Sequence, residues 1–415
     1  MARVFLHIDM DTFFVSCERA KNDTLKNKPV VIASNLKRAI ISAASYEVKK
    51  LGFKTGDPFY KVKEQIKDLV VIEPHYDLYS MMSKKIFEYI QDHYSNKIEV
   101  YSIDECFIDI TNEYKKYDTP LNMAKHIQQS LLKHLKIPCS IGISYTKFLA
   151  KMSTNMAKPF GIIETKKEDI ETRFYDLDIK KIFGVGKASV KKLNDYGIQT
   201  YRDLINCKND IFLKKVFGNR YFMLIKDLRG ENENKQHVLN EDIKSISNSE
   251  TFMNDDSNDY LFIIKELRRI LNNICNRAKD LNLEGREISV SIRHQNREWI
   301  RKSKKLSNWT NNEETIWNYV LFLFESMWES EYIRGLGIAL SSLRSVFSIN
   351  KSIELFENKN ASEIDKIINN NNFKFEKNVL KSANQYLKEQ SVQKENIKFL
   401  RKNTAKRDKK IDLEN

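Results

Sequence analysis

Apolar positions in the first 170 residues alternate between the two-residue spacing of strands and the three-to-four-residue spacing of helices. Runs rich in β-branched and aromatic residues predict strands at 4–10, 29–33, 39–43 and 139–144, and a hairpin at 99–111. Helical spacing predicts helices at 12–20, 45–52, 77–94, 121–135 and 146–156, with Thr12 capping the first of them. This mixed order indicates an α+β unit whose helices lie on one face of a sheet.

The pattern changes after residue 170. Short helices are predicted over 171–236, and a polar stretch without apolar periodicity predicts a linker over 237–246. A second α+β unit is predicted over 247–346, with helices at 260–278 and 313–330 and strands at 287–294 and 333–343. A basic tail is predicted over 347–415, and from about Lys359 it is rich in Asn and Lys and is expected to form partial helix with little packing.

Composition narrows the class of protein. A chain of 415 residues is too long for one core, so two to four domains are expected. The net charge of +14 favours a polyanionic partner, most often nucleic acid, although a basic solvated surface is the alternative. No apolar run approaches ~20 residues, so no membrane span is expected. Five scattered cysteines without a CxxC pair favour a reducing cytoplasm and oppose a structural zinc site.

Acidic residues interrupt two of the predicted strands. Asp104 and Glu105 lie among apolar neighbours, and burying such a pair is costly unless a cation compensates it. Asp9 ends the first strand, so adjacent strands would bring these three carboxylates together. Without His or Cys beside them, they suit Mg²⁺ or Mn²⁺ better than zinc. Two such ions would activate an attacking oxygen and neutralise a leaving pyrophosphate; a simple hairpin cap is the plainer alternative.

Several segments, taken together, resemble the signature of Y-family translesion DNA polymerases, most of all the DinB branch. They are Ile8-Asp9-Met10-Asp11-Thr12-Phe13-Phe14, Ser45-Tyr46-Glu47, Tyr101-Ser102-Ile103-Asp104-Glu105 and Asn155-Met156-Ala157-Lys158-Pro159. The resemblance spans roughly residues 3–345. Residues 75–79 and 101–106 are also similar to the UmuC-type branch, which leaves the subfamily open.

The resemblance implies a multidomain right-hand fold. The palm, with a βαββαβ-type sheet, would comprise 1–15 and 76–170, and the small fingers 16–75. A helical thumb with a helix-hairpin-helix would occupy 171–236. An α+β little finger would occupy 247–346, followed by a basic tail.

The resemblance also implies roles for the acids and their neighbours. Asp9, Asp104 and Glu105 match the carboxylates that hold two catalytic Mg²⁺ ions, with Mn²⁺ possible, and Met10 matches a backbone carbonyl ligand. Phe13 and Phe14 match the aromatic pair of the nucleotide pocket. Phe14 would be the steric gate, whose ring excludes a ribose hydroxyl.

Further implied contacts concern phosphates. Tyr46 and Lys158 match triphosphate contacts, as does Lys49, where the family usually has arginine; lysine keeps the charge but loses the bidentate grip. In the thumb, Gly184, Gly186 and Lys187 would bind a DNA phosphate, although a lone GxG is usually only a turn. Four arginines of the second unit would hold the DNA backbone without reading sequence. They are Arg286, Arg293, Arg297 and Arg301.

A short peptide at 352–356 resembles the clamp-binding motif of bacterial polymerases, with Ser352 where glutamine is usual. Its apolar residues Ile353, Leu355 and Phe356 would fill a pocket on a sliding clamp.

The sequence therefore predicts a monomeric, template-directed DNA polymerase of modest fidelity. It would add deoxynucleotides to a primer 3′ end opposite damaged bases, in a bacterial cytoplasm at the nucleoid. Primer–template DNA, deoxynucleoside triphosphates and a sliding clamp are the expected partners. Two alternatives are a catalytically silent DNA- and clamp-binding protein of the same fold, and a palm-type nucleotidyl cyclase. The thumb motif and the basic second unit have no use in a cyclase.

Overall fold

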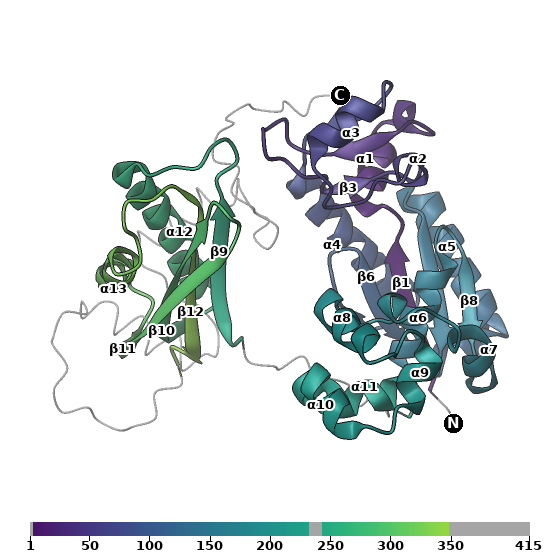
Figure 1. Cartoon of the computed structure of the whole chain (residues 1–415). Coiled ribbons are helices and arrows are strands. Elements are labelled where there is room, and N and C mark those ends of the chain that lie inside the picture. The colour runs from purple at the N-terminus through teal and green to yellow at the C-terminus, as the bar shows by residue number, and fades with distance from the viewer. Residues whose placement is uncertain (1–2, 232–242, 348–415) are drawn as a thin grey trace. The chain divides into compact units, whose positions relative to one another are not determined.

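The computed structural model describes residues 3–231 and 243–347 (Figure 1). They form two compact units. The first comprises 3–35 and 39–231, and the second comprises 36–38 and 243–347. None of the helices within these ranges is long and apolar enough to cross a membrane.

The main sheet of the first unit has the strand order β5-β6-β1-β7-β8. Its strands are β1 (Phe5–Met10), β5 (Ile98–Val100), β6 (Glu105–Asp109), β7 (Cys139–Ser144) and β8 (Ile162–Thr165). The central strand β1 pairs antiparallel with both β6 and β7, whereas β8 runs parallel to β7. Strand β8 was not predicted, but the hairpin of β5 and β6 confirms the one expected at 99–111.

Helices cover both faces of this sheet, so the prediction that they lie on one face only is wrong. Side chains of a strand alternate between faces. Leu6, Ile8 and Met10 share a core with α4 (Tyr76–His93) and α5 (Pro120–Leu135). His7 lies on the opposite face, where it meets α6 (Lys147–Ala157). There Gly142 on β7 allows close approach, because a Cβ on it would lie only 2.0 Å from the Ala150 carbonyl oxygen of α6.

A small sheet with the order β3-β2-β4 belongs to the same unit. Its strands are β2 (Val30–Ile32), β3 (Ala43–Ala44) and β4 (Val70–Ile72), so the strand predicted at 39–43 is shorter and later than expected. The accompanying helices are α1 (Phe13–Lys21), α2 (Tyr46–Lys50) and α3 (Phe59–Gln65). Thr12 occupies the position before α1, but its side chain makes no capping hydrogen bond, because its backbone is left-handed with φ of 44°.

The short helices predicted after residue 170 pack around a core of their own. They are α7 (Ile170–Phe174), α8 (Lys187–Asp195), α9 (Tyr201–Asn206), α10 (Asp210–Phe217) and α11 (Tyr221–Leu228). Phe148 and Met152 of α6 join this core, together with the buried Tyr201, whose hydroxyl donates to the Leu228 carbonyl oxygen. Helix α6 thus lies between the main sheet and these helices.

The second unit is an antiparallel sheet of order β11-β10-β12-β9 with two helices on one face. Its elements are β9 (Ser245–Thr251), α12 (Tyr260–Asp280), β10 (Leu283–His294), β11 (Trp299–Thr310), α13 (Glu313–Glu325) and β12 (Ile333–Ser345). Strands β9 and β11 were not predicted, and a linker reaching residue 246 is wrong because β9 begins at Ser245. Both missed strands carry mostly polar residues, so their sequences lack apolar alternation.

Candidate active site and nucleic-acid interface

The three acids singled out from the sequence meet at one end of the main sheet. Asp9 at the end of β1 lies directly opposite Glu105 at the start of β6. Asp104 lies at the same level, since its carbonyl oxygen accepts a hydrogen bond from the Met10 amide at 2.9 Å. Burial raises the pKa of Asp9 to about 6, and the charges of Asp104 and Glu105 add to that rise. The predicted convergence of two strands is confirmed.

Lysines compensate the carboxylates in the structure. The ammonium of Lys158 lies 2.6 Å from Asp9 Oδ1, and Lys151 Nζ of α6 contacts Glu105 Oε2. Burial by itself would raise the pKa of Glu105, but hydrogen bonds from His7 and Lys151, with the charge of Lys151, lower it to about 2. Glu105 therefore stays ionised at neutral pH.

His7 backs this carboxylate from inside the protein. Its Nε2 lies 3.2 Å from Glu105 Oε2, and its Nδ1 lies 3.0 Å from Thr154 Oγ1 on α6. Burial lowers the pKa of His7 to about 4, so the ring is neutral at physiological pH. Sequence reasoning missed His7 and Lys151. The two-residue spacing of His7 and Asp9 along β1 was the available signal, because it places both on one sheet face.

The donor set fits a hard divalent cation. Asp9, Asp104 and Glu105 offer carboxylate oxygens, and the side chain of Met10 is buried in the core, which leaves its backbone carbonyl for any ligand role. The raised pKa of Asp9 reflects clustered buried charge that a cation would relieve. Across residues 3–231 and 243–347, no three His, Cys, Asp or Glu side chains are arranged, as they stand, so that they could hold a metal ion. Lys151 and Lys158 supply the positive charge instead.

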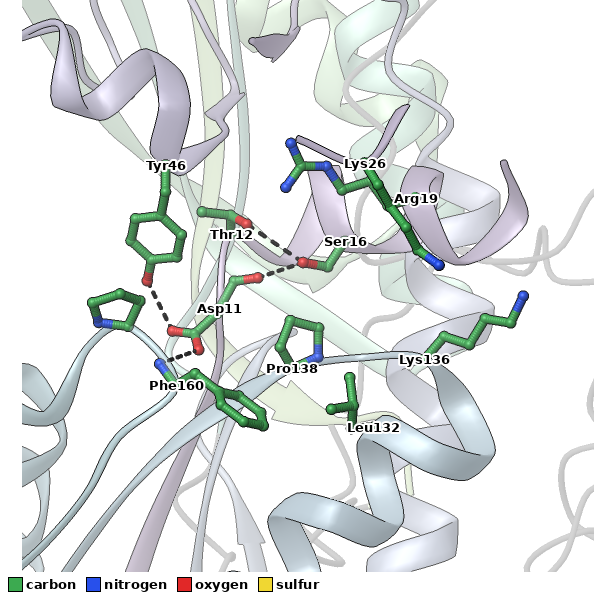
Figure 2. A pocket seen from close by; sticks show the side chains of 11 residues that line it. Asp11, Thr12, Ser16, Arg19, Lys26, Tyr46, Leu132, Lys136, Pro138 and Phe160 are labelled. Atoms are coloured by element: carbon green, nitrogen blue, oxygen red, sulfur yellow. Dashed lines mark hydrogen bonds between the residues drawn. The ribbon is translucent and has the colours of Figure 1, made fainter. Parts of the chain in front are cut away.

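Asp11 differs from Asp9 in that its carboxylate accepts hydrogen bonds from three separate parts of the first unit. Its Oδ1 accepts a hydrogen bond from the Tyr46 hydroxyl at 2.8 Å, and its Oδ2 accepts one from the Phe160 amide at 2.8 Å (Figure 2). Its Oδ1 also accepts a hydrogen bond from Ser140 Oγ at 3.0 Å. It thereby joins α2, β7 and the turn after Lys158. A cavity of about 260 Å³ adjoins these groups.

The other residues expected in the nucleotide pocket lie on α1 and α2. Lys49 Nζ sits 4.9 Å from the centroid of the Tyr46 ring. Burial lowers the pKa of Lys49, and the positive charge of Lys158 lowers it further, because the two ammonium groups repel each other. Phe13 is buried in the core, whereas Phe14 is partly exposed.

The thumb motif forms a glycine-dependent turn at a helix start. Gly184 has φ of 87°, a region that favours glycine, and Gly186 immediately precedes α8 without a side-chain cap. Lys187 is the first residue of α8. The first-turn amides of α8 are therefore available to an anion.

The arginines of the second unit do not all occupy one strand. Arg286 and Arg293 lie on β10, Arg297 lies in the turn to β11, and Arg301 lies on β11. Arg293 donates to Thr251 Oγ1 at 2.8 Å, and Arg301 donates to Ser289 Oγ at 2.5 Å. Those two arginines thus lie on the sheet face away from α12 and α13.

Arg286 stacks on Trp309 instead, with its guanidinium 4.2 Å from the ring centroid. The clamp-binding residues Ile353, Leu355 and Phe356 lie outside the described residues.

Comparisons with known proteins agree with this geometry. Residues 8–155 match the model of the impB/mucB/samB family, and residues 243–353 match the C-terminal domain of the same family. DNA polymerase IV of Oceanobacillus iheyensis is 34% identical over 357 residues, covering 85% of this chain and 84% of that protein. DNA polymerase IV of Ureaplasma parvum serovar 3 is 34% identical over 358 residues, covering 86% of this chain and 98% of that protein.

Solved structures agree as well. A Y-family DNA polymerase chimera of Dbh and Dpo4 has a TM-score of 0.72 and 26% identity, covering 82% of this chain and 99% of its own. An insertion ternary complex of Dbh DNA polymerase has a TM-score of 0.55 and 25% identity, covering 81% and 98%.

Sheet, acid cluster and second unit together define the multidomain α+β fold of a Y-family polymerase with a C-terminal little finger. Within that class, the chain belongs to the DNA polymerase IV (DinB) family. It is a DNA-directed DNA polymerase of translesion synthesis, and the family implies metal-dependent catalysis. These relatives resolve the branch in favour of DinB. The silent binding protein and the nucleotidyl cyclase are set aside.

Proposed function

We propose that Asp9, Asp104 and Glu105, with the Met10 carbonyl, hold two Mg²⁺ ions at which a primer 3′ end is extended. The observation that carries this proposal is the register that sets Asp9 opposite Glu105, with Asp104 beside Met10. Bound ions would supply charge stabilisation at the attacking and leaving oxygens. Mn²⁺ has the same ligand preference and would substitute.

The chain's own residues prepare this site. His7 and Lys151 keep Glu105 ionised and fixed from the interior, so its free oxygen faces the reaction. Lys158 Nζ lies 2.6 Å from Asp9 Oδ1. With a cation held by the carboxylates, this ammonium would be free to contact a nucleotide phosphate.

The triphosphate lies between Tyr46, Lys49 and Lys158. Asp11 supports this arrangement, because it ties Tyr46 to the turn after Lys158 and so fixes both phosphate contacts with respect to β1. Phe14 presents its ring to the sugar as the steric gate, and the buried Phe13 lies beside it with ring centroids 5.9 Å apart. A fixed ring rejects a 2′-hydroxyl by steric repulsion.

Primer–template DNA binds through phosphates. The amides at the start of α8 form one contact, with Gly184 and Gly186 allowing close approach and Lys187 adding charge. Arg293 and Arg301 form a second on the sheet face that also carries Trp299 and Lys305, with Arg286 and Arg297 nearby along β10 and the following turn. Such contacts position DNA without reading its sequence.

The palm, fingers and thumb boundaries inferred from the sequence apply in this proposal, with the little finger beginning at Ser245. Modest fidelity, a monomeric state, a cytoplasmic location and clamp binding through 352–356 complete it. Relatives support binding of substrates, since Dbh DNA polymerase has been solved as an insertion ternary complex and as a post-insertion binary complex.

The proposal is tested by Asp104→Asn in a primer-extension assay with Mg²⁺. Extension should disappear, because the amide removes a charged metal ligand, while primer–template binding measured by fluorescence anisotropy persists. Asp109→Asn is the matched control, since Asp109 lies on the same strand but accepts hydrogen bonds from Thr111. It should extend normally. Undiminished extension by Asp104→Asn refutes the metal site.

A further inference from the structure

The ring of Phe14 rests on an aromatic partner of another helix. It stacks on Tyr79 of α4 with ring centroids 4.2 Å apart and an angle of 11° between the planes. Tyr76 meets both rings edge-on, with centroids 6.1 Å away. Stacked and edge-to-face pairs are favourable arrangements for aromatic rings. The position of the Phe14 ring is therefore set by the position of Tyr79.

Tyr79 is itself anchored by a buried carboxylate. Its side chain is fully buried, and its hydroxyl donates to Glu18 Oε1 at 2.7 Å. Glu18 lies on α1, four residues after Phe14, and is only 6% exposed. His75 Nδ1 lies 2.8 Å from the same Glu18 oxygen. A buried hydroxyl without an acceptor is costly, so the carboxylate fixes where the Tyr79 ring can lie.

We propose that Glu18 is a positioning residue for sugar selection, which acts on Phe14 through the Tyr79 hydroxyl. This inference rests on the proposed function, in which Phe14 is the steric gate. Steric rejection depends steeply on distance, so a functional side chain has to be held within about 0.5 Å. Without Glu18, the Tyr79 hydroxyl rotates toward another partner, and the ring beneath Phe14 moves with it. Space for a 2′-hydroxyl then opens.

The test is the selectivity ratio, defined as kcat/KM for dCTP divided by kcat/KM for CTP, in single-nucleotide insertion. A ratio is insensitive to the fraction of active enzyme, so a loss of stability alone does not change it. Glu18→Ala and Tyr79→Phe should each lower the ratio by about tenfold, as expected for one buried hydrogen bond. The double variant should be no worse than either single one, because both remove the same bond.

Two further variants complete the design. Glu18→Gln retains an acceptor oxygen and should keep most of the selectivity. Glu47→Gln should leave the ratio unchanged, because Glu47 pairs with Arg19, the next residue of α1, and not with the aromatic cluster.

Phe14→Ala distinguishes failure of the inference from failure of the proposed function. Wild-type selectivity in both Glu18→Ala and Tyr79→Phe, with collapse in Phe14→Ala, overturns the role of Glu18. Wild-type selectivity in Phe14→Ala overturns the steric gate itself. If Glu18→Ala fails to fold, Tyr79→Phe still tests the inference, because it removes only a single oxygen. Additive losses in the double variant overturn the route through the Tyr79 hydroxyl.

Discussion

Lys151→Met should destabilise the first unit strongly, because it removes the cation that compensates a buried carboxylate. The side chain of Lys151 is 9% exposed, and that of Glu105 is 13% exposed. The pKa of Glu105 lies at about 2 against an ordinary value of 4.5, which corresponds to about 3 kcal/mol at 1.36 kcal/mol per pKa unit. His7 and Lys151 lower this pKa together, so about 3 kcal/mol is the upper limit for the contribution of Lys151. A lowered acid pKa stabilises the fold above the ordinary pKa and loses that effect as the pH falls through 2. At pH 7 the contribution is therefore present in full.

The assay is thermal unfolding at pH 7 followed by two signals. All four tryptophans lie in the second unit, so tryptophan fluorescence follows that unit while far-UV circular dichroism follows both. The melting temperature of the first unit should fall measurably, by at most roughly 6–12 °C, at 2–4 °C per kcal/mol. The fluorescence transition should stay in place.

Lys147→Met is the matched control. Lys147 lies one turn earlier on α6 and pairs with Glu99, whose side chain is 26% exposed, so a loss below about 1 kcal/mol is expected. Equal losses of stability in the two variants would show that burial does not strengthen the contribution of the Lys151–Glu105 ion pair. An unchanged melting temperature in Lys151→Met would show the same.

Two other predictions concern substrates. Asp11→Asn should raise KM for the incoming deoxynucleotide by about tenfold with kcat changed far less, because an amide cannot accept from all three donors around it; steady-state insertion kinetics measure both, and a fall in kcat alone contradicts it. Arg301→Gln should reduce the slope of log affinity for DNA against log salt by about 1. Lys302→Gln should leave that slope unchanged, since Lys302 donates to the Ser326 carbonyl oxygen on the helical side; equal slopes in both variants count against the arginine face.

Much of the first unit could be predicted because its strands are apolar and its helices amphipathic. Strand β7 was expected at its observed bounds, and α4, α5 and α6 were expected to within two residues. Strand β11 could not be predicted, because it is an edge strand with one face open to solvent. Lysines and serines therefore fill positions that a central strand fills with apolar side chains.

The acid cluster could be predicted, whereas its support could not. Asp9 and Glu105 lie on two recognisable strands, and antiparallel pairing brings them together. Lys151 reaches Glu105 only because α6 crosses the sheet at Gly142, which is a property of tertiary packing. Glu18 was missed for the same reason, because its partner Tyr79 is 61 residues away.

The proposed reaction depends on the three carboxylates binding two divalent ions together. It is tested most directly by electron paramagnetic resonance titration of Mn²⁺, with primer–template and a non-hydrolysable deoxynucleoside triphosphate present. The wild-type protein should bind two ions per chain at the site, and Asp104→Asn should lose at least one of them. Two ions bound with unchanged affinity in Asp104→Asn would show that Asp104 is not a metal ligand.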